Sequence, residues 1–222
     1  MRYNFVREGK QRPRWGYRLM KAFPYPELRQ QILFFDIGIN TETHFRWVNP
    51  ADLDNYLLDV IAARNFPADL ENYIHLQRKE NKMVFRQYAD PNCGFKKLLF
   101  VIGATKECQY QVVEAFLDYL STRWFEQFGS MQEVSSSGKI YERFNEIVEQ
   151  AFEVIPKEVL MKVKTHCKLC NQYFGVYLRK SLVEEAPSYP VAIVFQHAHH
   201  ALLVYVDDKY ESRGESIVNI TG

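Results

Sequence analysis

The 222-residue chain has no apolar run long enough to cross a bilayer. Its apolar stretches fall well short of the ~18 consecutive residues of a membrane span. The opening residues, MRYNFVREGKQRPRWGYR, also lack the apolar core of a secretory signal peptide. We therefore expect a cytoplasmic protein.

Cysteine is scarce, with four residues in the chain: Cys93, Cys108, Cys167 and Cys170. Without a secretory signal, this number does not indicate a disulfide framework. Cys108 stands at the start of a helical pattern, where a thiolate is stabilised, but no base lies near it in the sequence. We interpret Cys93 and Cys108 as structural or incidental.

Glycine-rich loops that cradle phosphate are missing. Gly94, Gly103 and Gly129 are isolated, so the chain is not expected to bind a nucleotide itself. No set of acid, base and nucleophile has a spacing that demands a catalytic role. A protein without enzymatic activity is the favoured interpretation.

The chain has no large excess of positive or negative charge, since its net charge is +1, but the basic residues are concentrated near the N-terminus. Residues 1–29 hold eight Lys/Arg against Glu8 and Glu27, interleaved with aromatic residues such as Trp15. Such an arm can bind single-stranded nucleic acid, an anionic membrane or an acidic protein face. The alternative is an arm that packs on its own domain with its basic groups in water.

The hydrophobic pattern predicts an α+β fold built on an antiparallel five-stranded sheet with helices on one face. The unbroken run LLFVI within 96–105 favours a central strand, buried on both faces. Asn49 and Pro50 are good start signals for a helix of about 14 residues. The other expected strands are 31–39, 43–49, 72–80 and 82–90, and the other helices are 110–129 and 140–155, the last one ended by Pro156.

This order of elements over residues 31–155 resembles the longin domain and its relatives, the roadblock and adaptor small-subunit folds. The resemblance also rests on one local stretch, MVFRQYADPNCGFKKLLFVIGATKECQYQVVEAFLDYLSTRWFEQFG. It implies a platform that binds a small GTPase or a trafficking-type partner, often as a dimer with a similar subunit. No heptad repeat or membrane anchor follows the last helix, so a regulatory or scaffold role is expected rather than membrane fusion.

The chain is therefore divided into a basic aromatic arm (1–29), a longin-like domain (30–156) and a small C-terminal β module (157–222). Strands are expected at 158–165, at QYFGVYLRK, at 191–196 and at 201–210. SLVEEAPSYP is interpreted as a loop, and 207–214 as the exit of a hairpin with Gly214 as its turn residue.

The β module contains the pattern Cys167-x2-Cys170-x26-His197-x2-His200. Both pairs fall at tight connections between expected strands, which is the arrangement of a zinc ribbon. His199 is an alternative ligand, and His166 a further candidate. A structural zinc site is the main hypothesis. Free thiols beside a polar turn are the second interpretation, and a redox or catalytic site is the third.

Three functions follow from these features. The first is a longin-like interaction platform or regulatory subunit whose C-terminal β module is stabilised by a structural zinc ion. The second is a nucleic-acid-binding protein that uses residues 1–29 and the zinc ribbon. The third is a metal-dependent hydrolase, for which Glu184, Glu185, Asp207 and Asp208 are the nearby carboxylates.

Overall fold

A computed structural model describes residues 25–39, 42–49, 72–78, 81–89, 97–128, 143–197 and 200–218. The chain forms two compact units. The larger unit contains Pro24–Met161 and Tyr177–Lys180, and the smaller unit holds Lys162–Val176 and Ser181–Gly222. The basic arm before residue 25, the expected helix after Asn49, and Cys93 lie outside the described residues.

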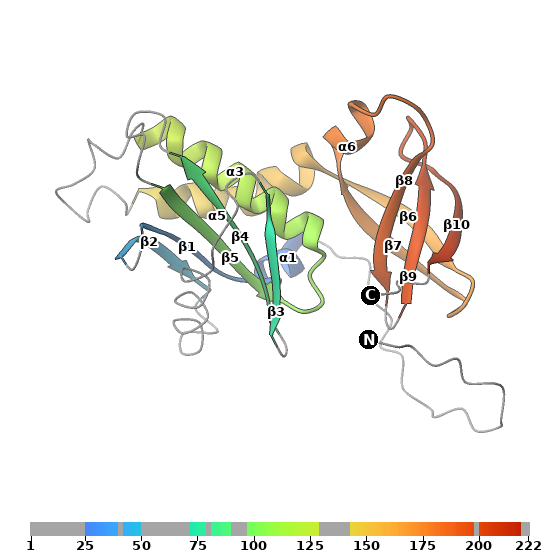
Figure 1. Cartoon of the computed structure of the whole chain (residues 1–222), viewed down its shortest axis with the longest axis horizontal. Helices are drawn as coiled ribbons and strands as arrows, with labels where there is room; N and C mark the ends of the chain where they lie inside the picture. The colour runs from blue at the N-terminus through green and yellow to red at the C-terminus, as the bar shows by residue number, and fades with distance from the viewer. Residues whose placement is uncertain are drawn as a thin grey trace, which may run out of the picture. The chain divides into compact units, whose positions relative to one another are not determined.

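The larger unit is built on one antiparallel sheet with the strand order β2-β1-β5-β4-β3 (Figure 1). β5 is the central strand, as the run LLFVI predicts, and its residues 98–102 are all buried. The strands are β1 (Ile32–Ile39), β2 (Glu42–Val48), β3 (Ile74–Arg78), β4 (Asn81–Ala89) and β5 (Lys97–Thr105).

Helices α3 (Tyr110–Phe128) and α5 (Phe144–Val154) cover one face of this sheet (Figure 1). Phe100 of β5 packs on Trp124 of α3, and Phe35 of β1 packs on Phe144 of α5. A short helix, α1 (Tyr25–Gln31), contacts α5 and β1. The α+β class with helices on one sheet face is confirmed for the described residues.

The end of α5 differs from the expectation that Pro156 stops the helix. The α-helix ends at Val154 and continues as a π-helical turn, η2 (Ile155–Val159), which contains Pro156. The backbone N–H of Leu160 donates to the carbonyl of Ile155, five residues back. Proline cannot donate a backbone hydrogen bond, and it is tolerated in the first turn of a helical segment, where no such bond is needed.

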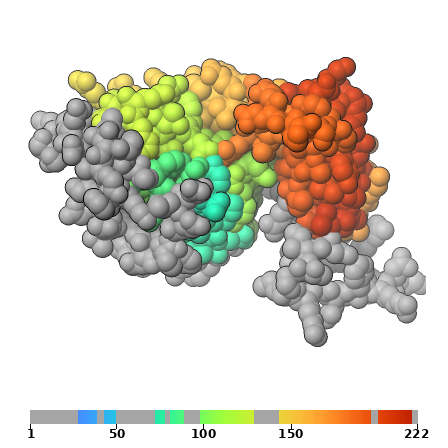
Figure 2. All heavy atoms as spheres, turned by 45° about the horizontal axis from the view of Figure 1, so that its top comes forward, coloured from blue at the N-terminus to red at the C-terminus, as the bar shows by residue number. Residues whose placement is uncertain are grey.

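The smaller unit contains a three-stranded antiparallel sheet, β10-β9-β8. β6 and β7 form a separate two-stranded sheet, and their residues Leu160–Met161 and Tyr177–Arg179 belong to the larger unit. Figure 2 shows the atoms of the C-terminal elements, coloured orange to red, gathered in one body. The elements are β6 (Leu160–Cys167), β7 (Gln172–Arg179), α6 (Lys180–Glu184), β8 (Val191–His197), β9 (His200–Val206) and β10 (Ser212–Val218).

Two expectations for this unit are wrong. The segment SLVEEAPSYP is not all loop, because its start lies in α6. Gly214 is not a turn residue: it lies within β10, and the turn is made by residues 207–211. The Asp207 carboxylate accepts the backbone N–H groups of Lys209 and Glu211, so the aspartate closes the turn without glycine.

No helix within the described ranges combines the length and the apolar character that crossing a membrane requires.

Candidate metal centre

The two cysteines flank the tight turn between β6 and β7. Cys167 ends β6, residues 168–171 form the turn, and Asn171 adopts a left-handed conformation with φ of 52°. Asparagine is one of the few residues that tolerate this conformation. The backbone N–H of Cys170 points at the Cys167 sulfur, with 3.4 Å between N and Sγ. The turn therefore brings both sulfurs together and offers one of them a backbone donor.

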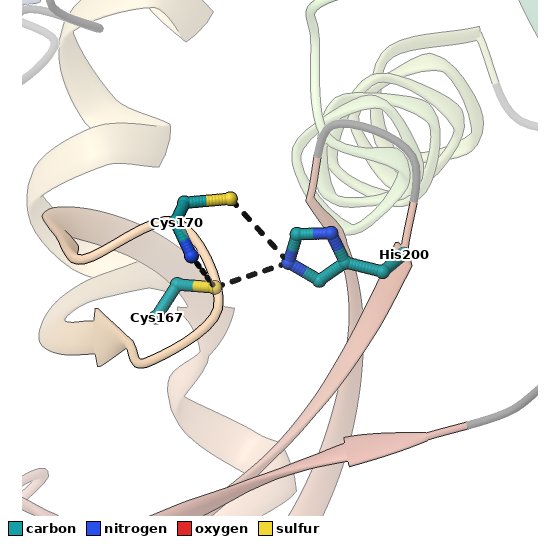
Figure 3. Close-up of side chains that lie close together, drawn as sticks. All are labelled: Cys167, Cys170 and His200. Atoms are coloured by element: carbon teal, nitrogen blue, oxygen red, sulfur yellow. Dashed lines mark hydrogen bonds between the residues drawn. The ribbon is translucent and has the colours of Figure 1, made fainter. Parts of the chain in front are cut away.

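His200, the first residue of β9, completes a group of three ligand atoms (Figure 3). Its Nε2 lies 3.0 Å from Cys167 Sγ and 3.8 Å from Cys170 Sγ. All three ligand atoms lie within 4.8 Å of one another. A tetrahedral zinc ion would place sulfur and nitrogen ligands roughly 3.6 Å apart. The observed separations lie on either side of this value, so the group fits one ion.

Burial differs among the three ligand residues. Cys167 is 0% exposed, whereas Cys170 and His200 are half-buried. Burial, together with the hydrogen bond and charge of Cys167, raises the pKa of Cys170 to about 11. A thiol with this pKa is protonated at neutral pH, and a bound cation would have to displace its proton.

The structure places the remaining predicted ligands as follows. His197 is the last residue of β8, and its backbone pairs directly with that of His200. Its side chain and all of His199 lie outside the described part of the chain. His166 does not join the three ligand atoms. Its Nε2 is 3.2 Å from Asn171 Oδ1, and its ring packs on Tyr173 with centroids 4.4 Å apart.

The carboxylates considered for a hydrolase have other partners. Asp207 forms an ion pair with Arg213 and closes the turn after β9. Glu184 accepts a hydrogen bond from the Tyr210 hydroxyl at 2.8 Å. Asp208 and Glu185 are exposed, and neither belongs to the group of ligand atoms found among the described residues.

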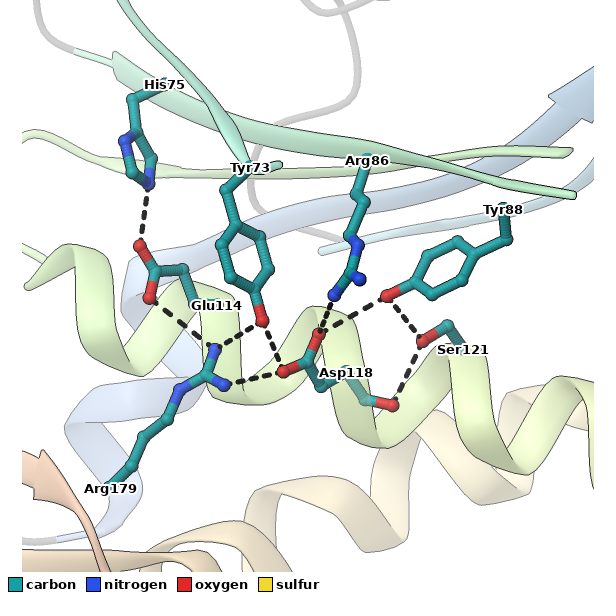
Figure 4. Close-up of polar contacts among 8 residues, drawn as sticks. All are labelled: Tyr73, His75, Arg86, Tyr88, Glu114, Asp118, Ser121 and Arg179. Carbon is teal, nitrogen blue, oxygen red and sulfur yellow. Dashed lines mark hydrogen bonds and ion pairs between the residues drawn. The ribbon is translucent and has the colours of Figure 1, made fainter. Parts of the chain in front are cut away.

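A polar cluster in the larger unit was missed by the sequence analysis (Figure 4). Arg179, at the end of β7, donates to Asp118 Oδ2 at 2.6 Å and to Glu114 Oε2 at 3.5 Å, both on α3. The Tyr73 hydroxyl donates to Asp118 as well, and Arg86 lies 3.7 Å from the same carboxylate. The spacing of the two acidic residues by four positions on one helix was the available signal.

Charges in this cluster balance, with two arginines against two carboxylates. Burial, and then the hydrogen bond to Asp118, raises the pKa of Tyr73 to about 12, so the tyrosine remains a donor at neutral pH. Both guanidinium groups lie over the Tyr73 ring, at 5.2 Å for Arg86 and 5.3 Å for Arg179. The cluster therefore ties β7 and β4 to α3.

Cys108, just before α3, has the character of a structural residue. It is completely buried, and burial raises the pKa of its thiol to about 12. Lys82 donates to its backbone carbonyl at 3.0 Å and lies 4.6 Å from the Tyr110 ring. The thiol is therefore held protonated and away from solvent, which agrees with the structural interpretation.

These features define an α+β protein of two units, one of which carries a Cys-Cys-His group within metal-binding distance. No known protein family matches the chain, and no curated protein matches it.

Proposed function

We propose that the chain is an interaction protein whose smaller unit is held together by a structural zinc ion. The convergence of Cys167 Sγ, Cys170 Sγ and His200 Nε2 within 4.8 Å carries this proposal. Two thiolates and an imidazole form a soft ligand set that suits zinc better than magnesium or calcium. The complete burial of Cys167 favours a structural ion over one that must keep a position open to water.

His197 is the proposed fourth ligand. Its backbone lies opposite that of His200 in the β8–β9 ladder. Directly opposed residues of an antiparallel pair have β-carbons about 4.5–5.5 Å apart on the same side of the sheet. Two histidines in such positions could reach one ion together with the two cysteines of the Cys-x2-Cys turn.

The larger unit is the proposed interaction platform, and it is interpreted as longin-like. The support is the order of its described elements: two strands, then three strands, then α3 and α5 on one face. Its partner would be a small GTPase or another subunit with a similar sheet edge, which makes the chain a scaffold or regulatory subunit. β2 and β3 are the edge strands of the sheet and offer the backbone for such pairing.

Metal analysis of the purified full chain tests the zinc centre. We expect about one zinc per chain, in accordance with a single tetrahedral site. The Cys167→Ser/Cys170→Ser variant loses the metal, while Cys108→Ala, a cysteine change in the other unit, retains it. His197→Ala weakens zinc binding more than His199→Ala. Absence of metal from the wild-type protein, after purification with zinc present, contradicts the proposal.

The platform proposal is tested by sizing chromatography with light scattering. The full chain is mixed with purified small GTPases loaded with GDP or with a non-hydrolysable GTP analogue. A complex with one nucleotide state, or a dimer of the chain through its sheet edge, is expected. A chain that stays monomeric and binds none of them contradicts this function while leaving the zinc centre standing.

A further inference from the structure

One face of the β6–β7 hairpin within the smaller unit is polar, basic and aromatic. On β6, Lys162, Lys164 and His166 alternate with buried residues and therefore lie on the outer side. Tyr173 and Gly175 of β7 share this side, because Tyr173 packs on His166 and the Lys162 side chain lies against Gly175. We call these five residues the hairpin face.

Two rings in tilted contact form the end of the hairpin face nearest the turn. The Tyr173 side chain is 82% exposed, an unusual degree for a large aromatic residue. Its ring lies 4.4 Å from the His166 ring at an interplanar angle of 36°. A contact of 3.2 Å between His166 Nε2 and Asn171 Oδ1 orients the imidazole. The ring pair is thus preorganised and open to solvent.

The side chains of two lysines extend the hairpin face away from the turn. A β-carbon at position 175 would lie 2.2 Å from Cε of Lys162, so the lysine side chain lies directly over Gly175 of β7. Lys164 is exposed between Lys162 and His166. Their positive charges therefore lie beside the rings, on the same side of the ribbon.

Acidic residues are missing from this part of the sequence. No Asp or Glu occurs between Glu158 and Glu184, while Lys162, Lys164 and Lys168 fall within the hairpin. Among the described residues, Glu215 of the neighbouring strand β10 pairs with Lys168 at 3.4 Å. Lys168 is thus partly neutralised, whereas the exposed Lys164 brings a positive charge to the hairpin face.

We propose that the hairpin face binds single-stranded nucleic acid. Tyr173, backed by His166, stacks on a base near the turn, and Lys164 and Lys162 contact the phosphates that follow along β6. Exposed rings beside basic side chains are the combination that single strands require, and stacking accepts every base. An acidic peptide would use the lysines but would leave the exposed ring pair without a partner. The proposal is independent of any role of the larger unit.

Fluorescence anisotropy of a short labelled oligo(dT) with the zinc-loaded full chain tests the proposal. Tyr173→Ala is expected to weaken binding about tenfold, and Tyr173→Phe to retain most of it, because the ring rather than the hydroxyl stacks. Lys164→Glu weakens binding and lowers the slope of log affinity against log salt by about one. Tyr189→Ala and Lys209→Glu, exposed in the same unit but off the hairpin face, are the matched controls and bind like wild type.

Two outcomes overturn the proposal. The first is oligo(dT) binding that the hairpin variants leave unchanged, which would assign it to another region such as the basic residues 1–29. The second is no oligo(dT) binding at low salt, including the case in which labelled polyglutamate binds instead and identifies an acidic protein partner. Zinc content measured on each variant shows whether the smaller unit is still folded, so failure of this proposal is distinguishable from failure of the zinc centre.

Discussion

The two units of the chain are stabilised in different ways. In the larger unit, rings from β1, β2, β5, α3 and α5 pack in one buried cluster, in which Phe144 contacts Phe35, Phe45, Trp124 and Phe128. The core of the smaller unit is mainly aliphatic, and Phe195 is the largest apolar side chain buried among its described residues. Small β units with modest cores usually need a disulfide or a metal. The Cys-Cys-His group lies in the unit that has this need.

The largest expected effect on stability comes from removing two ligands of the proposed zinc ion. In Cys167→Ser/Cys170→Ser, β8–β10 should lose protection from hydrogen exchange while β5 keeps it. Structural zinc contributes about 10–16 kcal/mol in zinc-finger peptides at pH 7, which is as much as the whole stability of a typical domain. Unchanged protection of β8–β10 in the metal-free variant would show that the aliphatic core suffices.

A cavity in the aromatic cluster is the complementary test. Phe144→Ala should lower the free energy of unfolding of the larger unit by about 3–5 kcal/mol, because the side chain is fully buried. Phe144→Leu fills part of the cavity and should cost less. Urea denaturation measures both, and zinc content should stay at the wild-type level. Equal loss of zinc in these variants would mean that the two units do not fold independently.

The polar cluster should have an intermediate effect. Arg179→Ala leaves Glu114 and Asp118 without their shared partner and should cost about 1–3 kcal/mol, since the arginine side chain is only 17% exposed. Arg123→Ala on α3 removes the ion pair between Arg123 and Glu126. Their side chains are 46% and 55% exposed, so this change should cost less than about 0.5 kcal/mol. Denaturation of the two variants side by side checks this. If both variants lose the same free energy of unfolding, burial of the polar cluster does not contribute to stability.

The smallest expected effect on stability comes from Asp207 in the turn after β9. The backbone N–H of Glu211, with Arg213 and the N–H of Lys209, holds the pKa of Asp207 below its usual range. A lowered pKa in the folded state stabilises the turn above roughly pH 4, and this stabilisation is lost as the pH falls through the lower folded value. Carboxyl titration by NMR should show this low pKa and its rise in Arg213→Ala. An ordinary pKa in the wild-type protein would refute the role of Asp207 in the turn.

Much of the local structure was predictable because it depends on near neighbours. Apolar alternation predicts β6, and the 3.6-residue period predicts α3. The missed features depend on contacts made elsewhere. SRGESIV carries few strand-forming residues, and it becomes β10 because β9 offers it a backbone ladder. The unpredicted α1 is likewise supported by packing against α5 and β1.

The sequence by itself determined the α+β class, the central place of β5 and the cysteine pair of the candidate metal centre, since periodicity and short spacings are local properties of the chain. Only the tertiary structure decided that His200, 33 positions from Cys167, reaches its sulfur while His166, next to that cysteine, turns to Tyr173. It also decided that Arg179 meets an aspartate 61 positions away. Such meetings depend on how strands and helices pack, and no local pattern of residues records that packing.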